Sequence, residues 1–206
     1  MLIIGAGNLG KLILDQMLIE NMISKDDEVV FFDKNWNDPG ELLFNKYQVI
    51  NSMHEVEHIF KNSDKDFFVG IGNPRIRKKI TDIFENLGGN LSSIISRNSS
   101  ISPFNSDHNY AGMLAEPYVS IAHSVKIGKS CHLHACCTVA HQVTINDYVS
   151  IATNVSILGS CIIDSFSLIG SHSVILPNIK IGKNVVIGAG SCVDRNINDF
   201  ETFIKR

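Results

Sequence analysis

Two histidines have the spacing of a repeated site. His123 and His141 lie eighteen residues apart, and Gly159 and Pro177 follow at the same interval. An imidazole titrates near neutral pH, so its neutral form can accept a proton from an attacking nucleophile. A glycine at the third position leaves room beside His141. The interval therefore marks a candidate proton-transfer site, provided that the chain folds with a repeat of eighteen residues.

A second group of chemically capable residues runs from Cys131 to Cys137, which contains cysteines and histidines, the usual ligands of zinc. The repeat described below places Cys131 and Cys137 at inward positions on successive faces, where cysteine packs as a small apolar side chain. His132 and His134 flank the inward Leu133. We therefore expect neither a metal site nor a disulfide here.

The third candidate is a glycine-rich loop near the start of the chain. Gly5, Gly7 and Gly10 form the pattern GxGxxG, and Asp33 follows 23 residues after Gly10. Such glycines allow a tight turn and a close approach of phosphate to a helix N-terminus. An acidic residue at this distance can hydrogen-bond a ribose hydroxyl. The pattern predicts a nucleotide diphosphate site, and a strand-to-helix turn without a ligand is the alternative.

A repeat of six residues organises the second half of the chain. From Ile121 onward every sixth residue is aliphatic at thirteen consecutive positions: Ile121, Ile127, Leu133, Val139, Ile145, Ile151, Ile157, Ile163, Ile169, Ile175, Ile181, Ile187 and Val193. Four residues after each comes a small or β-branched residue. Residues that tolerate a turn, such as glycine and asparagine, often follow the aliphatic one.

Each unit of six is thus a short strand followed by a turn. Three units make a triangular coil of eighteen residues, and the strands of stacked coils pair in parallel. A helix is excluded because a period of six does not match about 3.6 residues per turn. We predict an all-β parallel β-helix over about residues 115–194, with His123 and His141 stacked at one edge.

The pattern of apolar and amphipathic segments in the first half of the sequence predicts an α/β domain. Strands are expected at Leu2–Ile4, Glu28–Phe32, Phe67–Ile71 and Leu91–Ile95, and helices at Lys11–Asn21 and Arg75–Asn86. This order predicts a half-sized Rossmann-like parallel sheet, which suits a nucleotide-sugar better than a complete NAD. The predicted domains are residues 1–95, a Rossmann-like nucleotide-sugar-binding domain, and residues 96–206, the β-helix.

Charge is sparse and uneven along the chain. Charged residues make up 19% of the 206 residues, with 25 in residues 1–100 and 14 in residues 101–206. The net charge of −3 argues against a nucleic-acid-binding protein that relies on phosphate contacts. No apolar run approaches the roughly 18 residues of a membrane span, and no signal peptide is expected. The five cysteines, an odd number, favour a reduced, cytoplasmic protein.

The whole chain resembles a known family of sugar acetyltransferases. The matching stretches are Ile4-Gly5-Ala6-Gly7, Phe32-Asp33-Lys34, Gly70-Ile71-Gly72-Asn73-Pro74-Arg75-Ile76-Arg77 and Val139-Ala140-His141. They are similar to the hexapeptide-repeat enzymes of the sialic-acid O-acetyltransferase and bacillosamine or viosamine N-acetyltransferase group (NeuD/PglD-like). The resemblance implies a left-handed β-helix, acetyl-CoA as donor, a nucleotide-linked amino sugar as acceptor, and a homotrimer with sites between adjacent β-helices.

The resemblance also implies roles for individual residues. The general base would be His141, with His134 supporting the site. The residues expected to bind the nucleotide-sugar are Gly5, Gly7, Asn8, Gly10, Asp33, Lys34 and Asn73. Those expected along the pantetheine arm of acetyl-CoA are Gly159, Ser171 and Ala189.

The sequence departs from the family pattern near the base. Ala140 stands where many relatives have a glutamate, and Ser150 where some have a second histidine. The Gly-x-Pro-Ala segment common after the last coil is missing, which leaves the contacts to the CoA adenine open. An amine tolerates a less basic histidine better than an alcohol does, since it is partly deprotonated near neutral pH. N-acetylation is therefore favoured.

We accordingly expect an acetyl-CoA-dependent N-acetyltransferase of a nucleotide-linked 4-amino-4,6-dideoxy sugar, in surface-polysaccharide or glycan precursor synthesis. The alternatives are O-acetylation of a sugar such as sialic acid and a metal lyase of the β-helix carbonic anhydrase type. An NAD-dependent oxidoreductase and a purely structural β-helix are weaker candidates. The nucleotide base and the stereochemistry of the sugar stay open.

Overall fold

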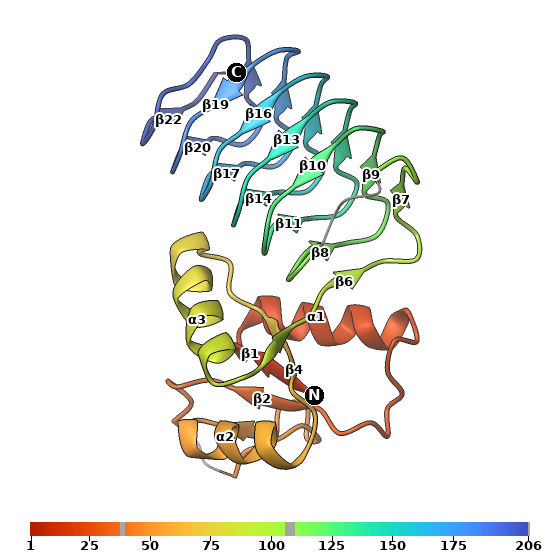
Figure 1. Cartoon of the computed structure of the whole chain (residues 1–206), viewed down its shortest axis with the longest axis vertical. Helices are drawn as coiled ribbons and strands as arrows, with labels where there is room; N and C mark the ends of the chain where they lie inside the picture. Colours follow the sequence, from red (N-terminus) through yellow and green to blue (C-terminus); the bar gives the residue numbers. More distant parts are fainter. Residues whose placement is uncertain (38–39, 106–109, 206) are drawn as a thin grey trace. The chain divides into compact units, whose positions relative to one another are not determined.

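The structure is a computed structural model that describes residues 1–37, 40–105 and 110–205. The chain divides into two compact units, Met1–Ser92 and Ser93–Arg206, which are described separately below (Figure 1). The division falls after Ser92, whereas the sequence placed the domain boundary after Ile95. Among the described residues, no helix combines the length and the hydropathy needed to cross a membrane.

The first unit is a parallel α/β sheet, as expected. Its strands are β1 (Leu2–Ile4), β2 (Val30–Phe32), β3 (Val49–Ile50), β4 (Asp66–Val69) and β5 (Asn90–Leu91), in the order β3-β2-β1-β4-β5. Its helices are α1 (Asn8–Ile19), α2 (Met53–Asn62) and α3 (Pro74–Asn86). The strand β3 and the helix α2 were not anticipated from the sequence. The strand order places the carboxyl ends of β1, β2 and β4 side by side.

The two faces of this sheet are covered by different helices. Successive residues of a strand point to opposite faces, and Leu2 and Ile4 share one buried cluster with residues of α2 and α3. In that cluster the ring of Phe84, from α3, packs against Phe32 at 5.3 Å and Phe60 at 6.3 Å between centroids. These aromatic contacts hold the end of β2, whose Phe32 pairs with Ile4 at the end of β1, directly before the glycine-rich loop.

The second unit is a three-sheet parallel β-helix (Figure 1). One sheet contains β10 (Lys126–Ile127), β13 (Thr144–Ile145), β16 (Ile162–Ile163) and β19 (Lys180–Ile181). The next contains β6 (Ile94–Ile95), β8 (Leu114–Ala115), β11 (His132–Leu133), β14 (Ser150–Ile151), β17 (Leu168–Ile169), β20 (Val186–Ile187) and β22 (Thr202–Phe203). The third contains β7 (Ser100–Ile101), β9 (Ser120–Ile121), β12 (Thr138–Val139), β15 (Ser156–Ile157), β18 (Val174–Ile175) and β21 (Cys192–Val193).

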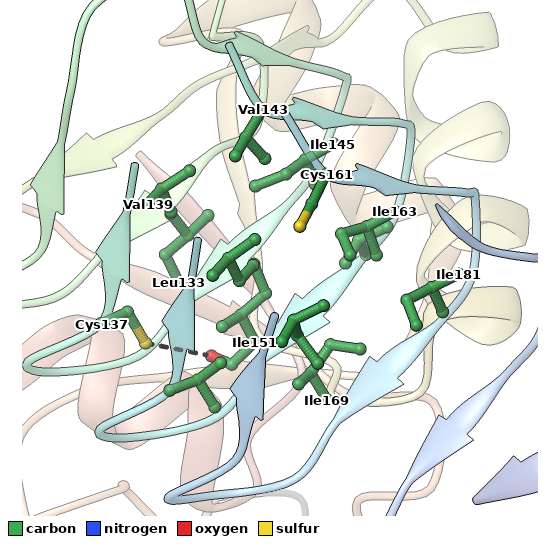
Figure 2. Close-up of a cluster of buried hydrophobic side chains, with 14 of the residues drawn as sticks. Leu133, Cys137, Val139, Val143, Ile145, Ile151, Cys161, Ile163, Ile169 and Ile181 are labelled. Carbon is green, nitrogen blue, oxygen red and sulfur yellow. Dashed lines mark hydrogen bonds between the residues drawn. The ribbon is translucent and has the colours of Figure 1, made fainter. Parts of the chain in front are cut away.

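The predicted register of eighteen residues is confirmed. Leu133 pairs with Ile151, which in turn pairs with Ile169. The aliphatic positions form one buried cluster, and Figure 2 shows Leu133, Ile151, Ile163 and Ile169 pointing into it. Because three short strands share one core, no single unit of six has to bury its own face.

The turns between strands all use the same backbone conformation. From Tyr118 to Asn184 every sixth residue has a positive φ of 53–66°, and none of them is glycine. A left-handed conformation costs a non-glycine residue about 1–2 kcal/mol. The stacked coils offset this cost with hydrogen bonds: the N–H of Ser160, for example, donates to the carbonyl of His141 in the preceding coil at 3.0 Å.

The prediction of one strand over Leu91–Ile95 is wrong. Leu91 ends β5 in the first unit, whereas Ile94 and Ile95 form β6 and pair with β8 of the β-helix. Ile95 pairs with Ala115 and Ile101 pairs with Ile121, so the first coil advances by twenty residues. This longer coil breaks the period of six, which is why the repeat in the sequence begins later than the β-helix itself.

Candidate active site

The predicted stack of His123 and His141 is confirmed. The two residues lie in the turns that follow the neighbouring strands β9 and β12, and their rings stack with centroids 5.7 Å apart and planes inclined by 12°. On the other side of His141, a Cβ at Gly159 would lie 2.7 Å from the ring carbon Cε1 and 3.0 Å from Nε2. The glycine therefore provides the space that the imidazole occupies, as the sequence predicted.

The backbone and side-chain contacts of His141 orient its ring. Its carbonyl accepts a hydrogen bond from the N–H of Ser160, and its Nδ1 lies 3.2 Å from the amide oxygen Oε1 of Gln142. An N–H at Nδ1 can donate to that oxygen, which leaves Nε2 as the proton acceptor. The residue is exposed, and Nε2 lies on the side of the ring next to Gly159. The orienting group is a neutral amide.

His134 occupies a different edge of the β-helix. It lies in the turn before β12, whereas His141 lies in the turn after it. His134 Nδ1 is 2.7 Å from Oε1 of Glu116, and Oε2 of the same carboxylate accepts the N–H of Ala135 at 2.9 Å. Glu116 was not singled out in the sequence. The register of the repeat could have revealed it, since Glu116 and His134 are eighteen residues apart and therefore occupy the same position in successive coils.

The turns of the stacked coils form rows, one after the sheet that contains β11 and another after the sheet that contains β12. The predicted CoA-binding residues lie in both of these rows. Gly159 is in the row of His141, whereas Ser171 follows β17 and Ala189 follows β20, in the row of His134. The single chain therefore brings His123, His141 and Gly159 together, and it aligns His134 with Ser171 and Ala189. It does not unite the two rows, because the sheet that contains β12 separates them.

In the first unit, the three glycines of the GxGxxG pattern serve different purposes. Gly5 has φ of +99°, which favours glycine, and a Cβ at Gly10 would lie 1.9 Å from the carbonyl oxygen of Gly5. These two glycines are required by the turn and by its packing. Gly7 has an ordinary φ of −76°, and within the described residues no atom lies within 4 Å of the Cβ it would carry. The fold alone does not require a glycine at Gly7.

The helix that begins after Gly7 presents backbone N–H groups. Within the described residues no side chain caps the first turn of α1, and that turn contains no acidic residue. By contrast, Oδ1 of Asn73 caps α3 by accepting the N–H groups of Arg75 at 3.0 Å and Ile76 at 3.2 Å. The N-terminus of α1 thus keeps the donors and the partial positive charge that bind an anion. The cap accounts for Asn73 without a ligand.

A hollow of about 420 Å³ opens beside this loop at the carboxyl ends of β1, β2 and β4. Four of the predicted substrate-binding residues line it, namely Gly5, Gly7, Asp33 and Lys34, and the others, Asn8, Gly10 and Asn73, do not. Apolar side chains of α3, Ile76 and Ile80, complete one wall. In open α/β sheets this is the place where ligands bind.

Two buried or half-buried charged side chains fix the walls of the hollow. Asp33 accepts the N–H of Ala6 at 3.1 Å through Oδ2 and the N–H of Asn35 at 3.0 Å through Oδ1. Arg77, which is fully buried, donates from Nη1 to the carbonyls of Ile71 at 3.0 Å and Gly72 at 2.9 Å. In the sequence Arg77 is noticeable only as part of a stretch that matches the acetyltransferases, so its function in holding the β4–α3 loop was missed.

The cysteine-rich segment packs as predicted. Cys131 and Cys137 are buried in the core, and Cys137 Sγ donates to the carbonyl of Ala152 at 3.0 Å. Figure 2 shows the Cys137 side chain directed toward the Ile151 carbonyl. Burial raises the pKa of Cys137 to about 12. Within the described ranges, no three His, Cys, Asp or Glu side chains converge to hold a metal ion.

Comparison with known proteins identifies both units. Residues 1–84 match the family model of the PglD N-terminal domain. Residues 160–195 match the model of the bacterial transferase hexapeptide, which comprises six repeats. The two matches fall on the α/β unit and on the β-helix, in the order that the structure shows.

Solved structures share the fold over nearly the whole chain. PerB from Caulobacter crescentus, in complex with CoA and GDP-perosamine, has a TM-score of 0.84 at 20% identity, covering 99% of this chain and 93% of that one. The acetyltransferase domain of PglB from Neisseria gonorrhoeae FA1090, in complex with acetyl coenzyme A, has a TM-score of 0.81 at 23% identity, with coverages of 99% and 95%. WeeI from Acinetobacter baumannii AYE has a TM-score of 0.73 at 23% identity, also with coverages of 99% and 95%.

Both units have a counterpart in the matched structures. An α/β unit with a glycine-rich loop and a β-helix of hexapeptides occur here in one chain, in the same order as in the matched structures. The chain thus combines a match to the PglD N-terminal domain with a match to the hexapeptide repeats of bacterial transferases, on the fold of the matched acetyltransferase structures.

Proposed function

We propose that this protein is an acetyl-CoA-dependent N-acetyltransferase that acts on the amino group of a nucleotide-linked 4-amino-4,6-dideoxy sugar, with His141 as the general base. The observation that carries the proposal is the seating of His141 between the His123 ring and Gly159, with Nδ1 facing the Gln142 amide oxygen. This arrangement leaves Nε2, beside Gly159, as the proton acceptor of an exposed residue at an edge of the β-helix.

The proposed chemistry uses that nitrogen as the base. The sugar amine attacks the carbonyl carbon of the acetyl thioester, and Nε2 of His141 takes the proton that the amine nitrogen loses. The carbon–sulfur bond then breaks, and the CoA thiolate takes a proton from the imidazolium. The amide and CoA are the products, and His141 returns to its neutral form.

The first unit supports the acceptor half of the proposal. Gly7, which lines the hollow, directly precedes the uncapped first turn of α1 and has a hydrogen in place of a side chain. A glycine that the fold does not require is explained by a ligand that approaches the backbone closely, as a diphosphate does at such loops. Asp33 and Lys34 lie on the same hollow and can contact the ribose and the phosphates.

The comparisons support the donor half. PglB binds acetyl coenzyme A, and PerB binds CoA together with GDP-perosamine, a nucleotide-linked sugar. We assign the pantetheine arm to Gly159, Ser171 and Ala189. Because these residues lie in two separate rows of one chain, we further propose a homotrimer in which adjacent copies contribute one row each. The proposed reaction is a cytoplasmic step in surface-polysaccharide or glycan precursor synthesis.

A substrate panel tests the proposal. Purified protein is incubated with acetyl-CoA and 4-amino sugars linked to UDP, dTDP or GDP, and free CoA is measured with a thiol reagent. We expect CoA release with at least one sugar, and mass spectrometry should locate the acetyl group on nitrogen. Acetylation of a hydroxyl group instead would favour an O-acetyltransferase. No transfer to any sugar of the panel would contradict the proposal.

A further inference from the structure

The contact between Glu116 and His134 is the second arrangement of side chains in the β-helix that suits proton transfer. Oε1 of Glu116 lies 2.7 Å from Nδ1 of His134, and the side chains are 9% and 26% exposed. The carboxylate is thus buried, whereas part of the imidazole reaches solvent. A carboxylate accepts hydrogen bonds only, so an N–H at Nδ1 satisfies it and leaves Nε2 of His134 as an acceptor.

Two other carboxylates at the edges of the β-helix have a simpler function. Asp147 accepts the N–H of Lys129 at 2.8 Å, and Asp199 accepts the N–H of Lys183 at 2.9 Å, each across successive turns. Glu116 does the same with Oε2, which accepts the N–H of Ala135. Its second oxygen differs, because it contacts an imidazole. The hydrogen bond between successive coils therefore accounts for only one of the two carboxylate oxygens of Glu116.

The position of His134 connects it with the proposed acetyl-CoA site. His134 is in the same row of turns as Ser171 and Ala189, to which the pantetheine arm is assigned above. The residues that follow His134 in its own slot, at intervals of eighteen, are Ala152, Gly170 and Gly188. The next large side chain at this position is Ile204, which stands opposite Gly188 in the last coil. The imidazole of His134 therefore borders a run of three small residues in the row of turns to which the pantetheine arm is assigned.

We propose that Glu116 is a positioning residue that holds His134 as a second proton acceptor of the acetyl transfer; this inference rests on the proposed function. A sugar amine that arrives as an ammonium ion loses two protons before the neutral amide is complete. His141 takes one and returns it to the CoA thiolate. His134 takes the other through Nε2 and passes it to water, so that ammonium and acetyl thioester give amide, CoA thiol and one released proton.

The variant Glu116→Gln tests this with little change in shape. The glutamine oxygen can still accept the Ala135 N–H, but its NH₂ group would face Nδ1 of His134 and require an acceptor there. The proton of the neutral ring would then move to Nε2, the atom that must accept. We expect kcat to fall about 100-fold, the lower end of what general base catalysis contributes, with KM within about threefold.

The tautomer of His134 is the second readout, independent of activity. Nitrogen-15 spectra of the histidine-labelled protein distinguish Nδ1–H from Nε2–H, and the variant His134→Gln assigns the signal. We expect Nδ1–H in the wild type and Nε2–H in Glu116→Gln. The matched control is Asp147→Asn, which alters an edge carboxylate that accepts the Lys129 N–H. Its kcat and the His134 signal should equal those of the wild type.

The outcomes separate this inference from the proposed function. If the wild type transfers acetyl groups and Glu116→Gln retains kcat within about threefold, the inference is overturned and the function stands. A loss of kcat with an unchanged His134 tautomer also overturns it, because Glu116 would then act on structure alone. If the wild type transfers no acetyl group to any sugar, the proposed function fails and this inference fails with it.

Discussion

Adding one methyl group beside His141 should separate catalysis from stability. In Gly159→Ala the new Cβ would lie 2.7 Å from the ring carbon Cε1, whereas ordinary contact begins at 3.4 Å. The ring must therefore move by several tenths of an ångström or more. Gly159 does not have a positive φ, so alanine suits its backbone. The ring of His141 is exposed and can move without disturbing the core.

These facts set the expected magnitudes. A Gly-to-Ala change at a compatible backbone position stabilises a protein by about 0.4–1 kcal/mol, which offsets the cost of moving an exposed ring. We therefore expect the free energy of unfolding of Gly159→Ala to stay within about 1 kcal/mol of the wild type. Misplacing a catalytic group by about 1 Å can cost about 100-fold in rate, so a fall in kcat of about 10- to 100-fold is expected.

The assay combines urea unfolding with steady-state release of CoA. A double variant provides the control: if Gly159→Ala acts through the imidazole, it should cost little more once His141→Ala is present. A kcat within about twofold of the wild type, or full additivity of the two changes, would show that the position of this ring does not limit the reaction. A large loss of stability would show that the change is not local.

Three further variants test other parts of the structure. Gly10→Ala should lower the free energy of unfolding by about 3 kcal/mol, because the added Cβ would meet backbone atoms. Gly7→Ala should lower it by less than about 1 kcal/mol, but it should weaken nucleotide-sugar binding at least about tenfold. Urea unfolding measures the stability of both variants, and the fluorescence of Trp36, the only tryptophan, measures nucleotide-sugar binding. Equal losses of stability in the two variants would contradict the assignment of Gly10 to the fold and of Gly7 to the ligand. Burial raises the pKa of Cys137 to about 12, from the ordinary value of 9.0 for a cysteine thiol. The unfolded chain thus releases this proton first, and stability should fall as pH rises from 9 toward 12, by up to about 1.4 kcal/mol per pH unit; Cys137→Ala should flatten that slope, and an unchanged slope would be contrary evidence. Ile163→Ala, at a fully buried ladder position, should cost about 2–5 kcal/mol in urea unfolding, and a cost below about 1 kcal/mol would argue against the shared core.

The period of six made the β-helix predictable from sequence alone. Each aliphatic residue from Ile121 to Val193 occupies the same inward slot, because strand, turn and coil repeat without insertion. The same register predicted the stack of His123 and His141 and the space provided by Gly159. The first coil was missed because its advance of twenty residues, from Ile95 to Ala115, breaks that period.

Parts of the first unit left weaker signals. The strand β3 has two residues, too few for a pattern of alternation to be recognised. Helix α2 carries buried Val56 and Phe60 at a helical spacing, but most of its other residues are polar and exposed. The contact between Glu116 and His134 depends on side-chain orientation as well as register, and orientation cannot be inferred from spacing.

The most direct test of the account is the rate of acetyl transfer by His141→Ala. With the best acceptor from the substrate panel, kcat/KM is compared with that of the wild type and of His58→Ala, which removes an exposed histidine of α2. The account predicts a loss of at least about 100-fold in His141→Ala and none in the control. A value for His141→Ala within about threefold of the wild type would show that His141 is not the base.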